Sequence, residues 1–232
     1  MADDHRQGPF PVCDAPLYDT RSAGVMHEKE SEPIATWDLV ERSAVLAIYL
    51  ALLGRLWPAA LADTGGYARL LLMSEGLVVV LLLLRKPARQ LARRPRAWAI
   101  AFAGTVAPLL VRAGAGAPLA PRLAVGLLLV GLVLHMGAKL SLWRRFGVVP
   151  ADRGVCAHGL YRLVRHPMYL GYMITHVGFL LAQPSLWNAT VYGCSWALLV
   201  SRIRLEEELL AANADYRRYM QRTPWRLLPG LY

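Results

Sequence analysis

Six apolar runs limit the fold of this chain more than any other feature of its sequence. They cover residues 44–62, 67–84, 98–111, 123–142, 169–181 and 186–203. A helix that crosses a bilayer needs roughly 20 apolar residues, with about 17 as the lower limit. Residues 98–111 and 169–181 fall short of that length, so these two runs are expected to be tilted, shielded or incomplete crossings. We therefore predict an all-α, polytopic integral membrane protein with about six transmembrane helices.

The composition excludes an ordinary soluble protein. Of the 232 residues, 56% are hydrophobic, and the mean hydropathy is positive. That is too apolar for a soluble domain of this size. A net charge of +10 would favour nucleic-acid binding in a soluble protein, but here the cations lie beside apolar runs. We therefore predict contact with membrane lipid and no nucleic-acid partner. The cysteines at positions 13, 156 and 194 are too far apart to suggest a disulfide framework or a metal site.

Basic residues alternate between the connections of the apolar runs. They are dense in residues 85–96, 144–165 and 202–226, and sparse in the other connections. Because strongly basic loops stay in the cytoplasm, we predict a protein of a bacterial inner membrane with both termini cytoplasmic. Residues 1–36 are rich in acids and prolines and predict a mobile tail. Residues 37–142 then hold four transmembrane helices, and residues 143–232 hold a loop, a helical hairpin and an amphipathic tail suited to lie on the membrane or fold back as a lid.

The segment 159–171 reads Gly-Leu-Tyr-Arg-Leu-Val-Arg-His-Pro-Met-Tyr-Leu-Gly and is dense in polar and aromatic groups. Pro167 disfavours helical geometry at His166 and is tolerated at the first position of a helix, so a helix is expected to begin there. The free N–H groups and the dipole of such a helix start attract a carboxylate or phosphate. Arg162, Arg165 and His166 add cations to the same place. This pattern predicts an anion-binding loop, with contact to lipid headgroups as the alternative.

A second polar stretch, residues 202–210, follows the last apolar run and reads Arg-Ile-Arg-Leu-Glu-Glu-Glu-Leu-Leu. In a continuing helix Arg202 and Glu206 share one face, whereas Glu207 points elsewhere. The structural alternative is a solvated helix with weak surface ion pairs. The stretch lies on the same predicted side of the membrane as residues 159–171, so we expect its carboxylates to meet that loop.

These residues resemble the isoprenylcysteine carboxyl methyltransferase and phospholipid methyltransferase superfamily. The resemblance is carried by residues 159–171, the apolar hairpin, the pair Glu206-Glu207, Tyr216, Tyr219 and the stretch Arg226-Leu-Leu-Pro229. It covers about the last hundred residues, and the segment between the acid pair and Tyr216 is shorter than in that family. The resemblance implies an S-adenosylmethionine-dependent enzyme with a cytosolic cofactor pocket in residues 143–232. It also implies a lipophilic acceptor, which is a prenylcysteine carboxylate, a phospholipid amine or a related small molecule.

The resemblance further implies roles for single residues. The cofactor-binding residues would be Gly159, Tyr161, Arg165, His166, Pro167, Tyr169, Glu206 and Glu207. Arg202 and Glu206 would be the catalytic residues, with Arg202 nearer the acceptor, and no metal is expected. The chemistry of the side chains agrees, because a helix start with Arg165 suits the cofactor's carboxylate and a glutamate suits its ammonium. Methyl transfer is an in-line displacement, so most of the catalysis would be positioning.

Three ionisable residues inside apolar runs, Glu75, His135 and His176, keep other classes of protein open. Such groups are costly in a bilayer and often functional, so a proton-coupled transporter is one alternative. No internal repeat accompanies them, which weakens that hypothesis. A structural alternative pairs Glu75 with a histidine or with Lys139. An NADPH-dependent sterol or isoprenoid reductase and a non-catalytic scaffold are further alternatives. The sequence leaves the acceptor and the oligomeric state open.

Overall fold

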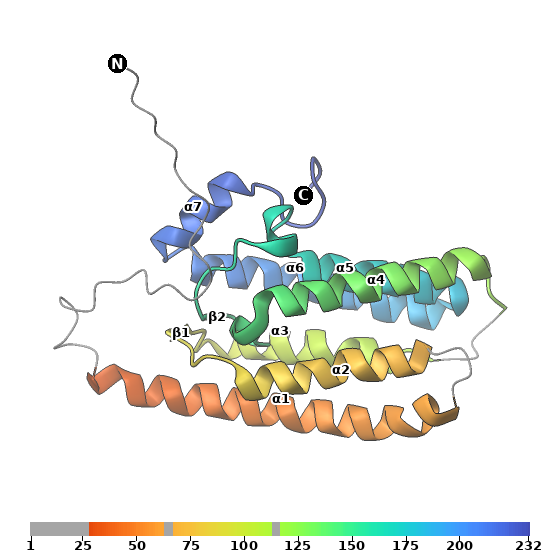
Figure 1. The fold of residues 1–232 in the computed structure, drawn as a ribbon, viewed down its shortest axis with the longest axis horizontal. Helices are drawn as coiled ribbons and strands as arrows, with labels where there is room; N and C mark the ends of the chain where they lie inside the picture. The colour runs from red at the N-terminus through yellow and green to blue at the C-terminus, as the bar shows by residue number, and fades with distance from the viewer. Residues whose placement is uncertain (1–27, 63–66, 113–116) are drawn as a thin grey trace, which may run out of the picture.

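The computed structural model describes residues 28–62, 67–112 and 117–232, which form a bundle of long helices (Figure 1). The α-helices are α1 (Glu28–Ala62), α2 (Tyr67–Leu84), α3 (Pro95–Val106), α4 (Pro121–Leu142), α5 (Pro167–Ala182), α6 (Leu186–Leu210) and α7 (Ala214–Arg222). Short 3-10 helices are η1 (Ala107–Leu110), η2 (Trp143–Arg145) and η3 (Gly159–Arg162). The strands β1 (Gln90–Leu91) and β2 (Ala151–Asp152) pair antiparallel, with Gln90 opposite Asp152. The predicted all-α class is confirmed as a mostly helical fold, in which the described residues also form one short two-stranded ladder.

Five of the six predicted apolar runs each fall within one α-helix, whereas residues 98–111 extend over α3 and η1 and end one residue beyond η1. Pro95, Pro121 and Pro167 stand at the first positions of α3, α4 and α5, where the missing N–H group costs nothing. Helix α1 begins at Glu28, so the last residues of the predicted tail are helical, and the rest of that tail lies outside the described residues. Two helical stretches of the described chain, Ile34–Ala62 and Pro121–Arg145, are long and apolar enough to cross a membrane. Six crossings remain a prediction.

Helices α4 and α5 pack backbone against backbone. A Cβ atom added at Gly131 would lie 2.7 Å from the carbonyl oxygen of Gly171, and one added at Gly171 would lie 2.6 Å from the backbone nitrogen of His135. Neither position has room for a side chain. Small residues at such an interface let helices approach closely within a membrane. The close contact fixes the position of α5, whose first turn forms part of the site described below.

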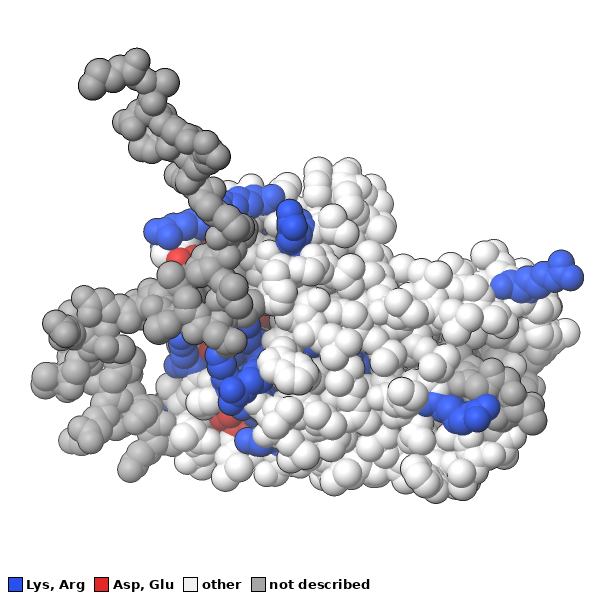
Figure 2. Space-filling view, in the orientation of Figure 1, with Lys and Arg blue, Asp and Glu red and all other residues white. Residues whose placement is uncertain are grey.

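The three basic connections gather at one end of the bundle (Figure 1). The Lys86 N–H donates a hydrogen bond of 2.7 Å to the Arg144 carbonyl, and Arg94 forms a 2.9 Å ion pair with Glu208. Figure 2 shows charged side chains concentrated at this end and a largely uncharged surface over the middle of the molecule. This arrangement agrees with the predicted alternation of loops. Which side of the membrane this end faces remains a prediction.

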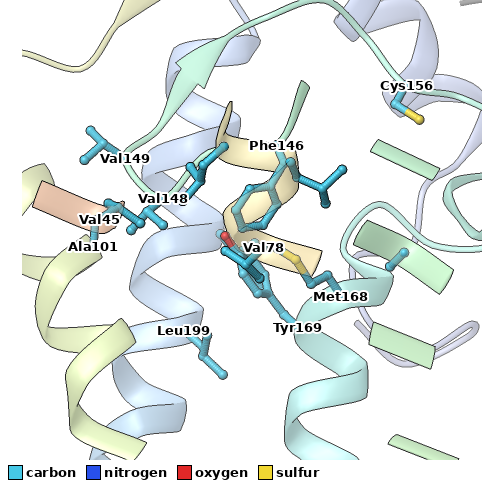
Figure 3. Packing of buried hydrophobic residues seen from close by; sticks show 14 of the residues in the cluster. Val45, Val78, Ala101, Phe146, Val148, Val149, Cys156, Met168, Tyr169 and Leu199 are labelled. Carbon is cyan, nitrogen blue, oxygen red and sulfur yellow. The ribbon is translucent and has the colours of Figure 1, made fainter. Parts of the chain in front are cut away.

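The apolar core reaches this end of the bundle and includes a loop. Phe146, Val148 and Val149, which follow η2, are buried in one cluster with residues of the helices, as Figure 3 shows. Met168 and Tyr169, from the first turn of α5, belong to the same cluster. The loop after α4 is therefore a packed part of the structure and provides a defined wall next to the start of α5.

Candidate active site

A pocket opens at the basic end of the bundle, between the loop 147–156, the start of α5, the end of α6 and α7. Its charged and imidazole side chains are Arg145, Arg153, Arg165, His166 and Glu206, and its aromatic side chains are Tyr161, Tyr169, Tyr216 and Tyr219. Apolar groups such as Met168 and Leu210 complete the lining. The predicted meeting of the loop 159–171 with the acid pair is therefore observed.

Glu206 and Tyr169 connect the two helices on either side of the pocket. The Tyr169 hydroxyl donates a 3.0 Å hydrogen bond to Oε2 of Glu206, and the rings of His166 and Tyr169 stack 5.6 Å apart. Within the described part of the chain, no side chain caps the start of α5 at His166. The first N–H groups of an α-helix have no partner within the helix, and Met168 and Tyr169 both line the pocket. The start of α5 and the carboxylate of Glu206 therefore both border the pocket.

Glu207 lies behind this lining at the centre of an ionic cluster. Its Oε1 accepts hydrogen bonds from Nε of Arg165 at 2.8 Å and from Nε2 of His166 at 3.1 Å, and its Oε2 accepts one from Nε of Arg226 at 2.8 Å. Burial raises the pKa of Glu207, but the hydrogen bonds from His166 and Arg226 and the charge of Arg165 outweigh it and lower the pKa from 4.5 to about 2. Glu207 therefore stays ionised and joins the loop, α6 and the C-terminal segment.

The C-terminal segment folds back over the loop. The backbone N–H of Arg165 donates to the backbone carbonyl of Trp225 at 2.9 Å, and the backbone N–H of His166 donates to that of Arg226 at 2.8 Å. In α7 the Tyr219 hydroxyl donates a 2.7 Å hydrogen bond to the Tyr161 carbonyl. Burial raises the pKa of the Tyr161 and Tyr219 hydroxyl groups, so both remain protonated donors. Helix α7 turns its tyrosines towards the pocket and forms one of its walls.

Arg202 lies one helical turn before Glu206 and is buried. Its Nη2 donates a 2.7 Å hydrogen bond to the Val148 carbonyl, and its guanidinium lies 5.4 Å from the centre of the Tyr169 ring. Its Nε is buried and has no hydrogen-bond partner among the described residues. Arg202 therefore sits beneath the pocket, deeper in the bundle than Glu206.

The structure thus separates the predicted site residues into two groups. Tyr161, Arg165, His166, Tyr169 and Glu206 line the pocket. Gly159, Pro167, Arg202 and Glu207 are not among its lining residues and support it from behind. Gly159 adopts a φ of +57° at the start of η3, and Pro167 begins α5. The loop 147–156 was missed as a wall of the pocket, because its short apolar stretches and its pair Asp152-Arg153 carry no signal that distinguishes it from an ordinary basic connection.

Two of the three ionisable residues inside the apolar runs, Glu75 and His176, have polar partners, whereas Nδ1 of His135 is buried with no hydrogen-bond partner among the described residues. Nζ of Lys139 lies 3.1 Å from Oγ of Ser74 and 3.7 Å from Oε1 of Glu75. Nδ1 of His176 accepts a 3.1 Å hydrogen bond from Nε1 of Trp196. Glu75 thus pairs with Lys139, which agrees with the structural alternative for that residue.

The fold and the site define the class of this protein: it is a helical bundle with candidate membrane-spanning helices and a polar pocket at the basic end. The chain belongs to the family described as "Protein of unknown function (DUF1295)", whose model matches residues 98–223. That range contains both halves of the pocket, from the loop after α4 to α7.

Similar proteins include a curated plant enzyme and a solved structure. Protein-S-isoprenylcysteine O-methyltransferase A of Arabidopsis thaliana is 29% identical over 90 residues, which is 36% of this chain and 46% of that protein. The match therefore spans less than half of the curated relative. The structure of the eukaryotic intramembrane Ras methyltransferase ICMT (isoprenylcysteine carboxyl methyltransferase) is 21% identical, with a TM-score of 0.48, and the match covers 82% of this chain and 75% of that one. The resemblance to the isoprenylcysteine carboxyl methyltransferase superfamily is confirmed.

Proposed function

We propose that this protein is an S-adenosylmethionine-dependent membrane methyltransferase that acts on a lipophilic acceptor. The observation that carries the proposal is the pocket in which the uncapped start of α5 faces the carboxylate of Glu206. This pocket lies within the residues matched by the family model, and a curated methyltransferase is similar to part of the chain. The proposal includes six membrane crossings, a pocket that faces the cytoplasm and cytoplasmic termini, in a bacterial inner membrane.

The groups around the pocket fit the cofactor. Its carboxylate would bind the N–H groups of Met168 and Tyr169, where the helix start and the cation of Arg165 favour a negative charge. Its ammonium would pair with Glu206, and its adenine would lie against the rings of Tyr161 and Tyr216. When bound, S-adenosylmethionine supplies a methyl group on a positively charged sulfur. The protein's own contribution is to hold the reacting groups in line and to exclude water.

The acceptor would approach from the side of Arg202. This guanidinium lies one turn deeper in the bundle than Glu206, and its buried Nε has no hydrogen-bond partner among the described residues. An acceptor carboxylate would pair with it directly and would need no base. An amine or thiol acceptor would have to lose a proton, and Glu206 is the carboxylate in the pocket that would receive it.

The test is a transfer assay with detergent-purified protein. The protein is incubated with methyl-labelled S-adenosylmethionine and a total lipid extract from its host, and labelled products are identified by mass spectrometry. We expect label in a lipophilic product, and we expect Arg202→Ala to lower the yield while leaving cofactor affinity unchanged. Binding of the cofactor without any labelled lipophilic product would contradict the proposed class of acceptor.

A further inference from the structure

Four buried charged residues form a cluster beside the pocket. Asp38 and Glu41 come from α1, Arg85 follows α2, and Arg153 follows β2. Nη2 of Arg153 lies 2.7 Å from Oδ1 of Asp38 and 3.3 Å from Oε2 of Glu41. Arg85 also forms ion pairs with both carboxylates, at 3.2 Å with Asp38. Buried charges of this kind are tolerated because they are paired. The cluster joins α1 to the end of α2 and to the loop after α4.

Glu41 has a second set of contacts that Asp38 lacks. Its Oε1 accepts hydrogen bonds from the N–H groups of Val148 at 2.9 Å and Val149 at 3.2 Å. Glu41 itself is fully buried. Val148 and Val149 line the pocket and belong to the same apolar cluster as Val45 of α1 (Figure 3). A residue of the first helix therefore fixes the backbone of a pocket wall more than a hundred positions later in the chain.

The same backbone segment also holds Arg202. The Val148 carbonyl accepts the 2.7 Å hydrogen bond from Nη2 of Arg202, while the Val148 N–H donates to Glu41. The Arg202 guanidinium lies over the ring of Tyr169, whose hydroxyl donates to Glu206. A line of direct contacts thus runs from Glu41 through Val148 and Arg202 to the pocket.

We propose that Glu41 is a positioning residue of the active site, which sets the place of Arg202 through the backbone of Val148 and Val149. This inference rests on the proposed function, because Arg202 matters only if an acceptor reacts there. Glu41 and Asp38 both contact one side chain of the pocket lining, Arg153, but Glu41 also holds the backbone that binds Arg202. We therefore expect Glu41 to act on the rate of transfer and to leave cofactor binding unchanged. It lies outside residues 98–223, the part of the chain that the family model matches.

Asp38 provides a matched control. Asp38→Asn and Glu41→Gln each remove one negative charge from the same helix and weaken contacts with the same arginines. Only Glu41→Gln also changes the group that accepts from Val148 and Val149. A purely structural role of the cluster predicts the same behaviour for both variants once their thermal stabilities are compared.

The experiment measures three properties of both variants and of the wild type in detergent. These are the affinity for S-adenosylhomocysteine by calorimetry, the transfer of label to the lipid extract, and hydrogen exchange of the peptide that contains residues 147–151. For Glu41→Gln we expect unchanged affinity, turnover lower by about tenfold or more, and faster exchange, since a small misplacement near a reacting group has effects of this size. For Asp38→Asn we expect a similar loss of thermal stability with near wild-type turnover and exchange.

Equal turnover and equal exchange in the two variants would overturn the inference. If Glu41→Gln does not fold, Glu41→Asp replaces it, because the shorter side chain keeps the charge but does not reach both the arginines and the backbone. The two proposals fail differently. A wild type that does not bind S-adenosylhomocysteine contradicts the proposed function, whereas the exchange comparison tests the positioning by Glu41 whatever the protein binds.

Discussion

The hydroxyl group of Tyr169 donates a 3.0 Å hydrogen bond to Oε2 of Glu206, which connects the first turn of α5 to the end of α6. These residues are 37 positions apart in sequence, and they meet because the two helices form a hairpin whose open end is the pocket. The contact fixes the direction of the carboxylate before anything binds. Preorganisation of this kind lowers the cost of binding, because the side chain no longer has to be ordered by the ligand.

Tyr169→Phe is therefore expected to weaken cofactor binding moderately. The phenyl ring would still contact the Arg202 guanidinium, but Glu206 would lose the hydrogen bond from the Tyr169 hydroxyl. Fixing one free side chain costs about 0.5–1.5 kcal/mol, which corresponds to a two- to tenfold loss of affinity. Calorimetry with S-adenosylhomocysteine measures this loss. Tyr172→Phe is the control, because Tyr172 lies next to His135 and Lys139 rather than in the pocket lining. The affinity of this variant for S-adenosylhomocysteine should equal that of the wild type.

Two adjacent glutamates are expected to respond differently to the same substitution. Glu206→Gln should spare the fold and reduce cofactor affinity roughly ten- to a hundredfold, since one hydrogen bond to a charged group is worth about 1.5–3 kcal/mol. Glu207→Gln should instead destabilise the protein by about 3–5 kcal/mol, because it leaves Arg165 and Arg226 without their buried counter-charge. Thermal unfolding and calorimetry on both variants separate the two effects. A stable Glu207→Gln variant with weak binding would place Glu207 in direct contact with the cofactor.

The ionic cluster of Glu207 also predicts a dependence of stability on pH. The pKa of Glu207 is about 2 in the folded protein and 4.5 without its partners. Its contribution to stability is therefore complete above about pH 5 and is lost as the pH falls towards 2. Between about pH 7 and about pH 3, the melting temperature of the wild type should fall further than that of Glu207→Gln. Equal falls in the two proteins would show that Glu207 does not contribute through its charge.

Cysteine labelling tests the orientation of the bundle. Leu186 at the start of α6 is 86% exposed, and Arg93 at the opposite, basic end is exposed as well. In a background without the native cysteines, a membrane-impermeant reagent added to intact cells should label Leu186→Cys and should not label Arg93→Cys. The reverse pattern would put the pocket on the outer side of the membrane, away from cytosolic cofactors. Arg153 is unsuitable because it is buried, and Gly65 lies outside the described residues.

Local signals in the sequence were enough to predict the helices and half of the pocket. Apolar length predicts the positions of the long helices, and Pro167 predicts the start of α5. The alternation of basic loops predicts which connections share one end of the bundle. Each of these signals depends on residues close in sequence or on the contrast between membrane and water, so it can be interpreted without knowing how the helices pack.

The partners of buried charges could not be predicted in this way. Glu41 and Val148 are 107 positions apart, and Glu207 and Arg165 are 42 apart. Many arginines at the basic end could have reached either carboxylate, and only the packing of α1, α6 and the loops selects among them. For the same reason the sequence assigned Glu206 and Glu207 similar roles, although one lines the pocket and the other anchors the loop behind it.

The most direct test of the proposed function is calorimetric titration of the purified wild-type protein with S-adenosylhomocysteine and, separately, with NADPH. The account predicts saturable binding of S-adenosylhomocysteine, weakened in Glu206→Gln and unchanged in Tyr172→Phe, together with no binding of NADPH. Binding of NADPH without binding of S-adenosylhomocysteine would contradict the account and favour a membrane reductase.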